Sequence, residues 1–428
     1  MGARSPVHPF TKKGLRMELM LTPVRQRVST QEVADVAGTV RAGMAALPLR
    51  DRVKPGMRVC VAVGSRGISC YAEVVGAVVD SLRAAGADPF LVPAMGSHGA
   101  ATAEGQREVL LGYGMGELGV PILSSLDTVQ IGTTPDGMPV HWDRFAAEAD
   151  GVIVVNRIKA HTAFRAPWES GLFKIMAIGL GKPLGADVVH AHGVGTAMAK
   201  AARVAIATKN ILAGVAIVDN GQHRPAHIAV IPGERIESDE PPLLELAKRL
   251  QPNLPFDPLD LLIVEQMGKD ISGTGMDTNV IGMWRRNAGP RQPDTRCIAV
   301  LELTPDSHGN ATGIGMADIV PRRLVEQVDW AATYTNCLTA RNFAGARQPI
   351  TLPNDRAVIA AGLAGIDPAA ARVALIKNTL ELGTLWLSSA LVNEVSQHPA
   401  LEIIGPAQPL DFDAAERMVF PVTHAVLV

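Results

Sequence analysis

Short apolar runs alternate with longer amphipathic segments through the first part of the chain. The apolar runs are rich in β-branched residues and short enough for buried strands. They occupy residues 58–64, 90–93, 151–156 and 212–221. Between them, apolar residues recur at helical spacing over 69–88 and 197–208. Strands and helices in alternation predict parallel βαβ units, with helices on both faces of the sheet.

A second set of strands follows the proline-rich segment at 241–258. The apolar pattern predicts strands at 261–264, 297–303 and 371–376 and a helix over 324–340. A chain of 428 residues is long enough for two or three domains, each with its own core. We therefore predict an α/β protein of two lobes with mainly parallel sheets flanked by helices. The lobes span residues 1–255 and 256–428, and a cleft between them is a common place for a small-molecule site.

Composition narrows the class of protein. The chain has 40 Lys+Arg against 42 Asp+Glu and only 4% aromatic residues, so it lacks the basic and stacking surfaces of a nucleic-acid binder. Its four cysteines lie far apart, which is typical of a reducing compartment. The N-terminus lacks the apolar core of a secretory signal, and no run of 18 apolar residues appears. We expect a cytoplasmic protein with no nucleic-acid or membrane partner. The oligomeric state stays open, with a homo-oligomer as one option.

Two polar side chains follow the first two expected strands. Arg66 lies just beyond a strand and before a helix, where a guanidinium can hold a carboxylate or phosphate through two hydrogen bonds. His98 lies in a GSHG loop, and an imidazole in such a loop can act as acid and base. A solvated arginine and a hydrogen-bonded turn histidine are the alternatives. Loops after the carboxyl ends of parallel strands are nevertheless where function gathers in such sheets.

The densest chemistry lies in residues 156–193. Lys174 stands in GLFKIMAIG, where apolar neighbours would desolvate its amine and favour covalent chemistry. A lysine that extends from a helix edge to solvent is the alternative. His161, His190 and His192 could form a three-histidine zinc site, although their spacing is not that of a helical zinc pair.

Known nucleotide-binding motifs do not account for the chain. In ISGTGMDTNVIG the position of the third glycine of a dinucleotide fingerprint is Thr278, and GLGKPLGAD lacks the spacing of a phosphate loop. The segment 265–286 follows a strand, and its Asp277, Asn279 and Arg285 could reach into a cleft. The same segment is also compatible with an irregular loop without chemistry.

The order of these residues resembles the nickel-dependent lactate racemase family, the nickel-pincer-nucleotide isomerases. The family's arginine loop, its histidine loop and its lysine segment correspond to 65–67, 96–98 and 161–179. The histidine sixteen residues past the family lysine falls on His190. In the second lobe, 273–279 is similar to the family's G-x-P-x-D-x-N pattern, and its distal lysine falls on Arg285. The resemblance covers roughly residues 50–290.

The resemblance implies a cofactor and its ligands. Lys174 would tether a pyridinium-3-thioamide-5-thiocarboxylate mononucleotide, and His190 would complete the square-planar coordination of nickel. Ser65 and Arg66 would contact the cofactor. His192 is the alternative nickel ligand if the loop shifts by two residues. The protein would depend on cofactor-biosynthesis enzymes as partners.

The resemblance also implies a reaction, the racemisation or epimerisation of a small 2-hydroxy acid. His98 and His161 would flank the reacting carbon, and one would take the hydroxyl proton while hydride passes to the cofactor. Return of hydride to the other face, with the second histidine supplying the proton, inverts the centre. Arg66 and Arg285 would clamp the substrate carboxylate.

Three departures from the family pattern point away from lactate itself. Val63 replaces an aspartate of the arginine loop, and thirteen residues separate His161 from Lys174, about three more than in the racemase pattern. The substrate-side tyrosine and glutamine fall on Ile281 and Gly282. We therefore expect a different or larger 2-hydroxy acid. A zinc-dependent hydrolase and a non-catalytic, two-lobed anion-binding protein are the competing hypotheses.

Overall fold

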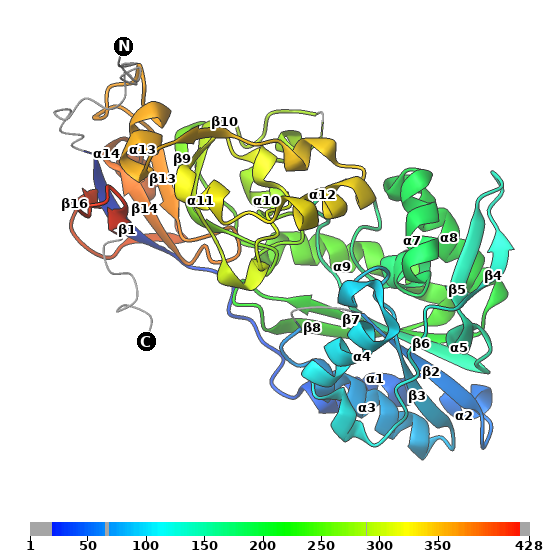
Figure 1. Ribbon diagram of the computed structural model, residues 1–428. Helices are drawn as coiled ribbons and strands as arrows, with labels where there is room; N and C mark the ends of the chain where they lie inside the picture. Colours follow the sequence, from blue (N-terminus) through cyan, green and yellow to red (C-terminus); the bar gives the residue numbers. More distant parts are fainter. Residues whose placement is uncertain (1–18, 65–67, 288, 420–428) are drawn as a thin grey trace, which may run out of the picture. The chain divides into compact units, whose positions relative to one another are not determined.

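The computed structural model describes residues 19–64, 68–287 and 289–419, which divide into two compact units (Figure 1). One unit covers residues 28–251. The other combines residues up to 27 with those from 252 onward. The expected division near residue 255 differs from this one at the N-terminus, because the first strand pairs within the C-terminal unit.

The unit of residues 28–251 contains a five-stranded sheet in the order β3-β2-β6-β7-β8. The first four strands are parallel and β8 is antiparallel to β7. These strands are β2 Arg58–Val63, β3 Asp88–Pro93, β6 Gly151–Arg157, β7 Ile211–Asp219 and β8 Pro225–Pro232. A separate antiparallel hairpin in the same unit consists of β4 Thr128–Thr133 and β5 Pro139–Asp143. The α/β fold class with a mainly parallel sheet is as expected.

Helices cover both faces of this sheet, which explains why its strands read as continuous apolar runs. Along β2, Val59 and Val61 pack into one buried cluster and Cys60 and Ala62 into another, because successive side chains point to opposite faces. The helices are α1 Val36–Ala46, α2 Leu49–Arg52, α3 Tyr71–Ala84, α4 Ala103–Gly112, α5 Arg144–Ala147, α6 Leu172–Lys174, α7 Lys182–Ala191, α8 Val194–Thr208 and α9 Ile236–Leu250.

The order of the strands reverses between β2 and β6. Helix α3 carries the chain from β2 to β3 on one face, and α8 carries it from β6 to β7 on the other. In open α/β sheets, ligands bind beyond the carboxyl ends of the strands at such a reversal. A ligand is therefore expected to bind at the loops that follow β2, β3 and β6.

The C-terminal unit contains a larger mixed sheet with the order β12-β11-β10-β9-β13-β14-β1-β15, and β16 also pairs with β1. Strands β9 to β13 are parallel, and β14, β1 and β15 add antiparallel pairs. The strands are β1 Met20–Gln26, β9 Leu259–Met267, β10 Thr295–Leu303, β11 Ile319–Pro321, β12 Ile350–Leu352, β13 Val373–Ile376, β14 Thr384–Ser388, β15 Leu401–Ile403, β16 Gln408–Pro409, β17 Asp411–Phe412 and β18 Met418–Val419. The helices are α10 Thr278–Ile281, α11 Arg322–Glu326, α12 Trp330–Thr339, α13 Asp355–Gly362 and α14 Ser389–Val395.

Two expected elements differ in the structure. The helix expected over 324–340 is broken, because the Asp329 side chain caps a new helix by accepting the Ala332 N–H at 2.9 Å. The proline-rich segment, for which no helix was predicted, is helical to Leu250, with Pro241 and Pro242 inside α9. In the described part of the chain, none of the helices is both long and apolar enough to cross a membrane.

Candidate functional site

The structure brings His161 and Lys174 together. His161 lies in the loop after β6, and Lys174 ends α6, a short helix whose other residues are buried. The Lys174 Nζ atom is 3.0 Å from Nε2 of His161. The lysine itself is half-buried, so its amine stands at the edge of the apolar core rather than inside it.

The hydrogen bonds of His161 indicate which atom donates and which accepts in its contact with Lys174. Its Nδ1 atom accepts the backbone N–H of Ala163 at 3.0 Å. A neutral imidazole whose Nδ1 accepts carries its proton on Nε2. The Nε2–H then donates to Nζ of Lys174, which can accept only as a neutral amine. This arrangement favours the nucleophilic form of the lysine.

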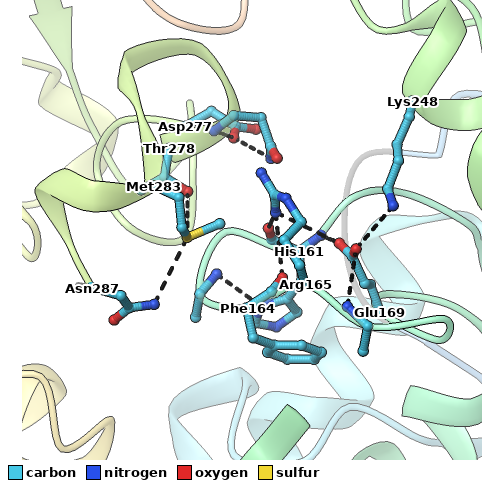
Figure 2. A network of polar contacts seen from close by, with 12 residues as sticks. His161, Phe164, Arg165, Glu169, Lys248, Asp277, Thr278, Met283 and Asn287 are labelled. Atoms are coloured by element: carbon cyan, nitrogen blue, oxygen red, sulfur yellow. Dashed lines mark hydrogen bonds and ion pairs between the residues drawn. The ribbon is translucent and has the colours of Figure 1, made fainter. Parts of the chain in front are cut away.

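A buried carboxylate holds the loop of His161 (Figure 2). The fully buried Glu169 side chain accepts the backbone N–H of His161 at 2.7 Å and lies 3.1 Å from Nζ of Lys248. Burial opposes the charge on Lys248, but hydrogen bonds to Glu245 and Glu169 outweigh burial and raise its pKa. Arg165 donates to the His161 carbonyl at 2.8 Å and pairs with Glu169 at 3.7 Å. The loop is therefore closed on itself through one acidic side chain.

Aromatic side chains cover the same loop. The Phe164 ring stacks on the His161 imidazole with centroids 4.3 Å apart. Trp168 stacks on Phe173 at 4.9 Å, and its indole N–H donates to the Glu237 carbonyl at 3.1 Å. Pro241 has no N–H to bond that carbonyl within α9, so the tryptophan supplies the missing donor.

Glu240, on α9, caps the helix that carries Lys174. Its carboxyl group accepts the Phe173 N–H at 2.9 Å. A Cβ atom on Gly171 would lie 2.2 Å from Oε1 of Glu240, so the close approach requires glycine there. Burial raises the pKa of Glu240 from its ordinary value near 4.5 to about 8, although the N–H groups of Phe173 and Leu172 lower it.

We predict that Glu240→Gln changes how stability depends on pH. A raised folded-state pKa means that the stability contributed by protonated Glu240 is complete below about pH 4.5 and is lost as pH rises toward 8. Over that window the parent should lose up to about 1.4 kcal/mol per pH unit relative to the glutamine variant. Urea unfolding at pH 5 and pH 8 measures the difference. Equal differences at the two pH values would show that Glu240 titrates normally.

The helix between Lys174 and His190 is interrupted twice. The first interruption is the π-helical turn Ile175–Gly179, in which the Leu180 N–H donates to the Ile175 carbonyl. The Met176 carbonyl accepts the Trp142 indole N–H at 2.7 Å. Lys182 then adopts a left-handed conformation with φ 55°. A continuous helix would separate residues 174 and 190 by about 24 Å along its axis. The interruptions remove that constraint, as is required if both side chains are to bind one cofactor.

The two histidines at the end of α7 differ. His190 lies in the last turn and is half-buried, whereas His192 is exposed and its Nδ1 atom lies 2.8 Å from the Val188 carbonyl. Among the described residues, no group of three or more His, Cys, Asp or Glu side chains is placed to hold a metal ion. His161, His190 and His192 are thus not gathered into the three-ligand site that a zinc enzyme needs.

The loop of His98 packs against the interrupted helix. His98 is exposed in the segment that follows β3. The Gly96 N–H donates to the Gly179 carbonyl at 3.0 Å, and a Cβ on Gly96 would lie 3.3 Å from Ile178. The structure therefore places the His98 loop on the turn that links Lys174 to His190.

Three further expected site residues are Ser65, Arg66 and Arg285. Ser65 and Arg66 fall outside the described residues. Arg285 belongs to the C-terminal unit, where its Nη1 atom pairs with Asp318 at 2.6 Å and its Nη2 atom donates to the Thr295 carbonyl at 2.6 Å. A substrate carboxylate would compete with Asp318 for this guanidinium, and the carboxylate-binding role of Arg285 stays a prediction.

Comparison with known proteins adds two findings. Residues 16–205 match the family model described as the lactate racemase N-terminal domain. The solved structure of the lactate racemase apoprotein from Thermoanaerobacterium thermosaccharolyticum aligns over 83% of this chain and 83% of its own, with a TM-score of 0.47 and 13% sequence identity. No curated protein matches the sequence.

Proposed function

We propose that the protein is a racemase or epimerase of a 2-hydroxy acid, acting through a nickel-pincer nucleotide attached to Lys174, and the match of residues 16–205 to the lactate racemase N-terminal domain model supports this proposal. The observation that carries this proposal is the contact between Lys174 and His161. The lone pair on Nζ that would accept the His161 Nε2–H is the same lone pair that would make a covalent bond to a cofactor.

The side chains of this unit fit such a group. Lys174 supplies a nucleophilic amine, and His190 supplies one half-buried imidazole, a ligand that suits nickel. Because the helix between Lys174 and His190 is interrupted, the two side chains are not held apart along one helical axis. Held by Lys174 and His190, such a group would supply the hydride acceptor and donor that the reaction at the substrate carbon needs.

The residues of the chain would perform the proton transfers. Once Lys174 is acylated, its nitrogen is no longer a basic acceptor. The Nε2–H of His161 would then be available to donate its proton to the substrate oxygen, and Nε2 would act as a base only in the tautomer that carries the ring proton on Nδ1. His98 would serve as the second base, since inversion requires proton transfer at either face of the reacting carbon. One histidine would take the hydroxyl proton of the substrate, and the other would supply a proton to the oxygen when hydride returns to the opposite face.

Phe164 supports a substrate other than lactate. Its ring covers the face of the His161 imidazole, in a loop longer than the racemase pattern provides. An apolar ring beside the reacting position favours a 2-hydroxy acid with an apolar or extended side chain. Lactate, whose side chain is one methyl group, would leave this surface unused.

We predict that Lys174→Ala abolishes cofactor attachment. The experiment is an intact mass of protein made together with the cofactor-building enzymes, with nickel analysed in the same sample. The parent should carry a mononucleotide-sized adduct on Lys174 and about one nickel per chain, because one lysine would hold one nucleotide. Lys159→Ala, which changes a lysine in the loop after β6, is the matched control and should load normally.

The result has clear alternatives. An unmodified parent, in a host that loads a known family member, would count against the proposal. Zinc in place of nickel, without added mass, would favour a hydrolase. Ligand-dependent closure without proton exchange at the substrate 2-position would favour a binding protein.

A further inference from the structure

A buried ion pair lies beneath the His98 loop. Lys182 and Asp143 are both fully buried, and Nζ of Lys182 lies 3.2 Å from Oδ2 of Asp143. The same ammonium donates to the Pro93 carbonyl, at the end of β3, at 2.6 Å. It also donates to Oε1 of Gln106 at 2.9 Å. Lys182 thus joins the end of a strand, a hairpin residue and helix α4.

Gln106 connects this ion pair to the loop. Its Nε2 atom donates to the Gly96 carbonyl at 2.7 Å and to the His98 carbonyl at 3.3 Å. An ammonium group can only donate, so Lys182 fixes the amide of Gln106 with its oxygen toward the lysine and its nitrogen toward the loop. The side chain is fully buried, so no solvent contact can replace these bonds.

Placing a lysine at position 182 costs free energy. Lys182 holds a left-handed conformation that an L side chain rarely adopts, and its charge is removed from water. An apolar residue at 182 together with a neutral residue at 143 would fill the same space without desolvating a charge. What the charged network supplies in return is directed hydrogen bonding to the backbone on either side of Ser97.

We propose that Lys182 and Gln106 are positioning residues that hold the His98 loop in the orientation its proton transfer needs. The proposal rests on the proposed function, because it gives His98 a task. Lys182 acts on Gln106, and Gln106 acts on the loop carbonyls. Neither side chain needs to touch the substrate.

Gln106→Glu tests the proposal. The substitution keeps the size of the side chain and an oxygen for Lys182, but it removes the N–H donor and turns a carboxylate toward the carbonyls of Gly96 and His98. Amide hydrogen exchange at 96–99 should rise about 5- to 10-fold in the cofactor-free full chain, which is the loss of about one hydrogen bond. The His98 ring resonances should shift in histidine-labelled NMR spectra, and the pH at which they titrate should change.

A matched control and a second variant complete the test. Gln130→Glu makes the same change at an exposed hairpin position and should leave the exchange at 96–99 and the His98 spectrum unchanged. If Gln106→Glu does not fold, Gln106→Met removes both polar bonds without adding charge and should release the loop in the same way.

Activity separates this proposal from the proposed function. In the loaded enzyme, turnover should fall about tenfold with Lys174 still loaded, and the loss should disappear in a His98→Ala background. A released loop in a protein without racemase activity would refute the function and leave the positioning of the loop established. Unchanged exchange and unchanged His98 resonances in both Gln106 variants would overturn the inference.

Discussion

His161→Ala should lower racemisation by the loaded protein by about 10²- to 10⁴-fold, the usual contribution of a positioned acid or base. The Ala163 N–H and the Phe164 ring hold the imidazole, and the Glu169 carboxylate holds the His161 backbone N–H, so the Nε2 atom keeps one position. His98→Ala should have an effect of similar size, because inversion uses both bases. Chiral chromatography of each enantiomer incubated with enzyme measures the rate.

The control is His227→Ala, which removes an imidazole from β8 at the edge of the sheet and should preserve turnover. Nickel and the Lys174 adduct are measured on each variant, so that a loss of loading is not counted as a loss of catalysis. A His161 or His98 variant that is fully loaded and turns over at the parent rate would contradict the two-base assignment.

Lys182→Met should destabilise the protein by about 3–5 kcal/mol, the usual cost of removing one partner of a buried ion pair. Burial raises the pKa of Asp143 and lowers that of Lys182, and in the parent each charge opposes the shift of the other. Methionine fills the space of the lysine but leaves the carboxyl group buried without a cation. Urea or thermal unfolding measures the loss.

Adding Asp143→Asn to Lys182→Met should recover much of that stability. The amide removes the unpaired charge, and its oxygen can still accept the Ala146 N–H that Asp143 binds at 3.0 Å to cap α5. A double variant as unstable as the single one would show that the lysine acts through its bonds to Pro93 and Gln106 rather than through the charge of Asp143.

Strands of this protein are predictable because they are buried on both faces. The apolar run at 151–156 corresponds to β6, and the run at 212–221 to β7, with ends that differ by one or two residues. The break at Asp329 in the helix predicted over 324–340 was missed, because the apolar spacing continues through the cap. Helix α9 was missed because its prolines suggest irregular chain, and only the tertiary contact with Trp168 shows how Glu237 is satisfied.

Some residues of the candidate site can be predicted from the sequence, and others can be found only from the fold. The order of His98, His161, Lys174 and His190 is visible in the sequence, and the contact between Lys174 and His161 joins residues only 13 apart. The side chains that hold them are not visible as a set, because Glu240 and Phe173 are 67 residues apart and Lys182 and Pro93 are 89 apart. A glutamine or glutamate in an amphipathic helix resembles a surface residue until the fold buries it.

Strand β1 sets an order of events during synthesis. It leaves the ribosome early, yet it pairs with β14 and β15, and Arg27, just beyond it, bonds to Glu402, 375 residues later. At usual translation speeds roughly 20 to 75 s separate the two. Residues 28–251 can complete their own sheet in that interval, while the apolar side chains of Leu21 and Val24 wait for partners. The nascent chain therefore carries an open strand that needs protection from other chains until β14 and β15 have been synthesised.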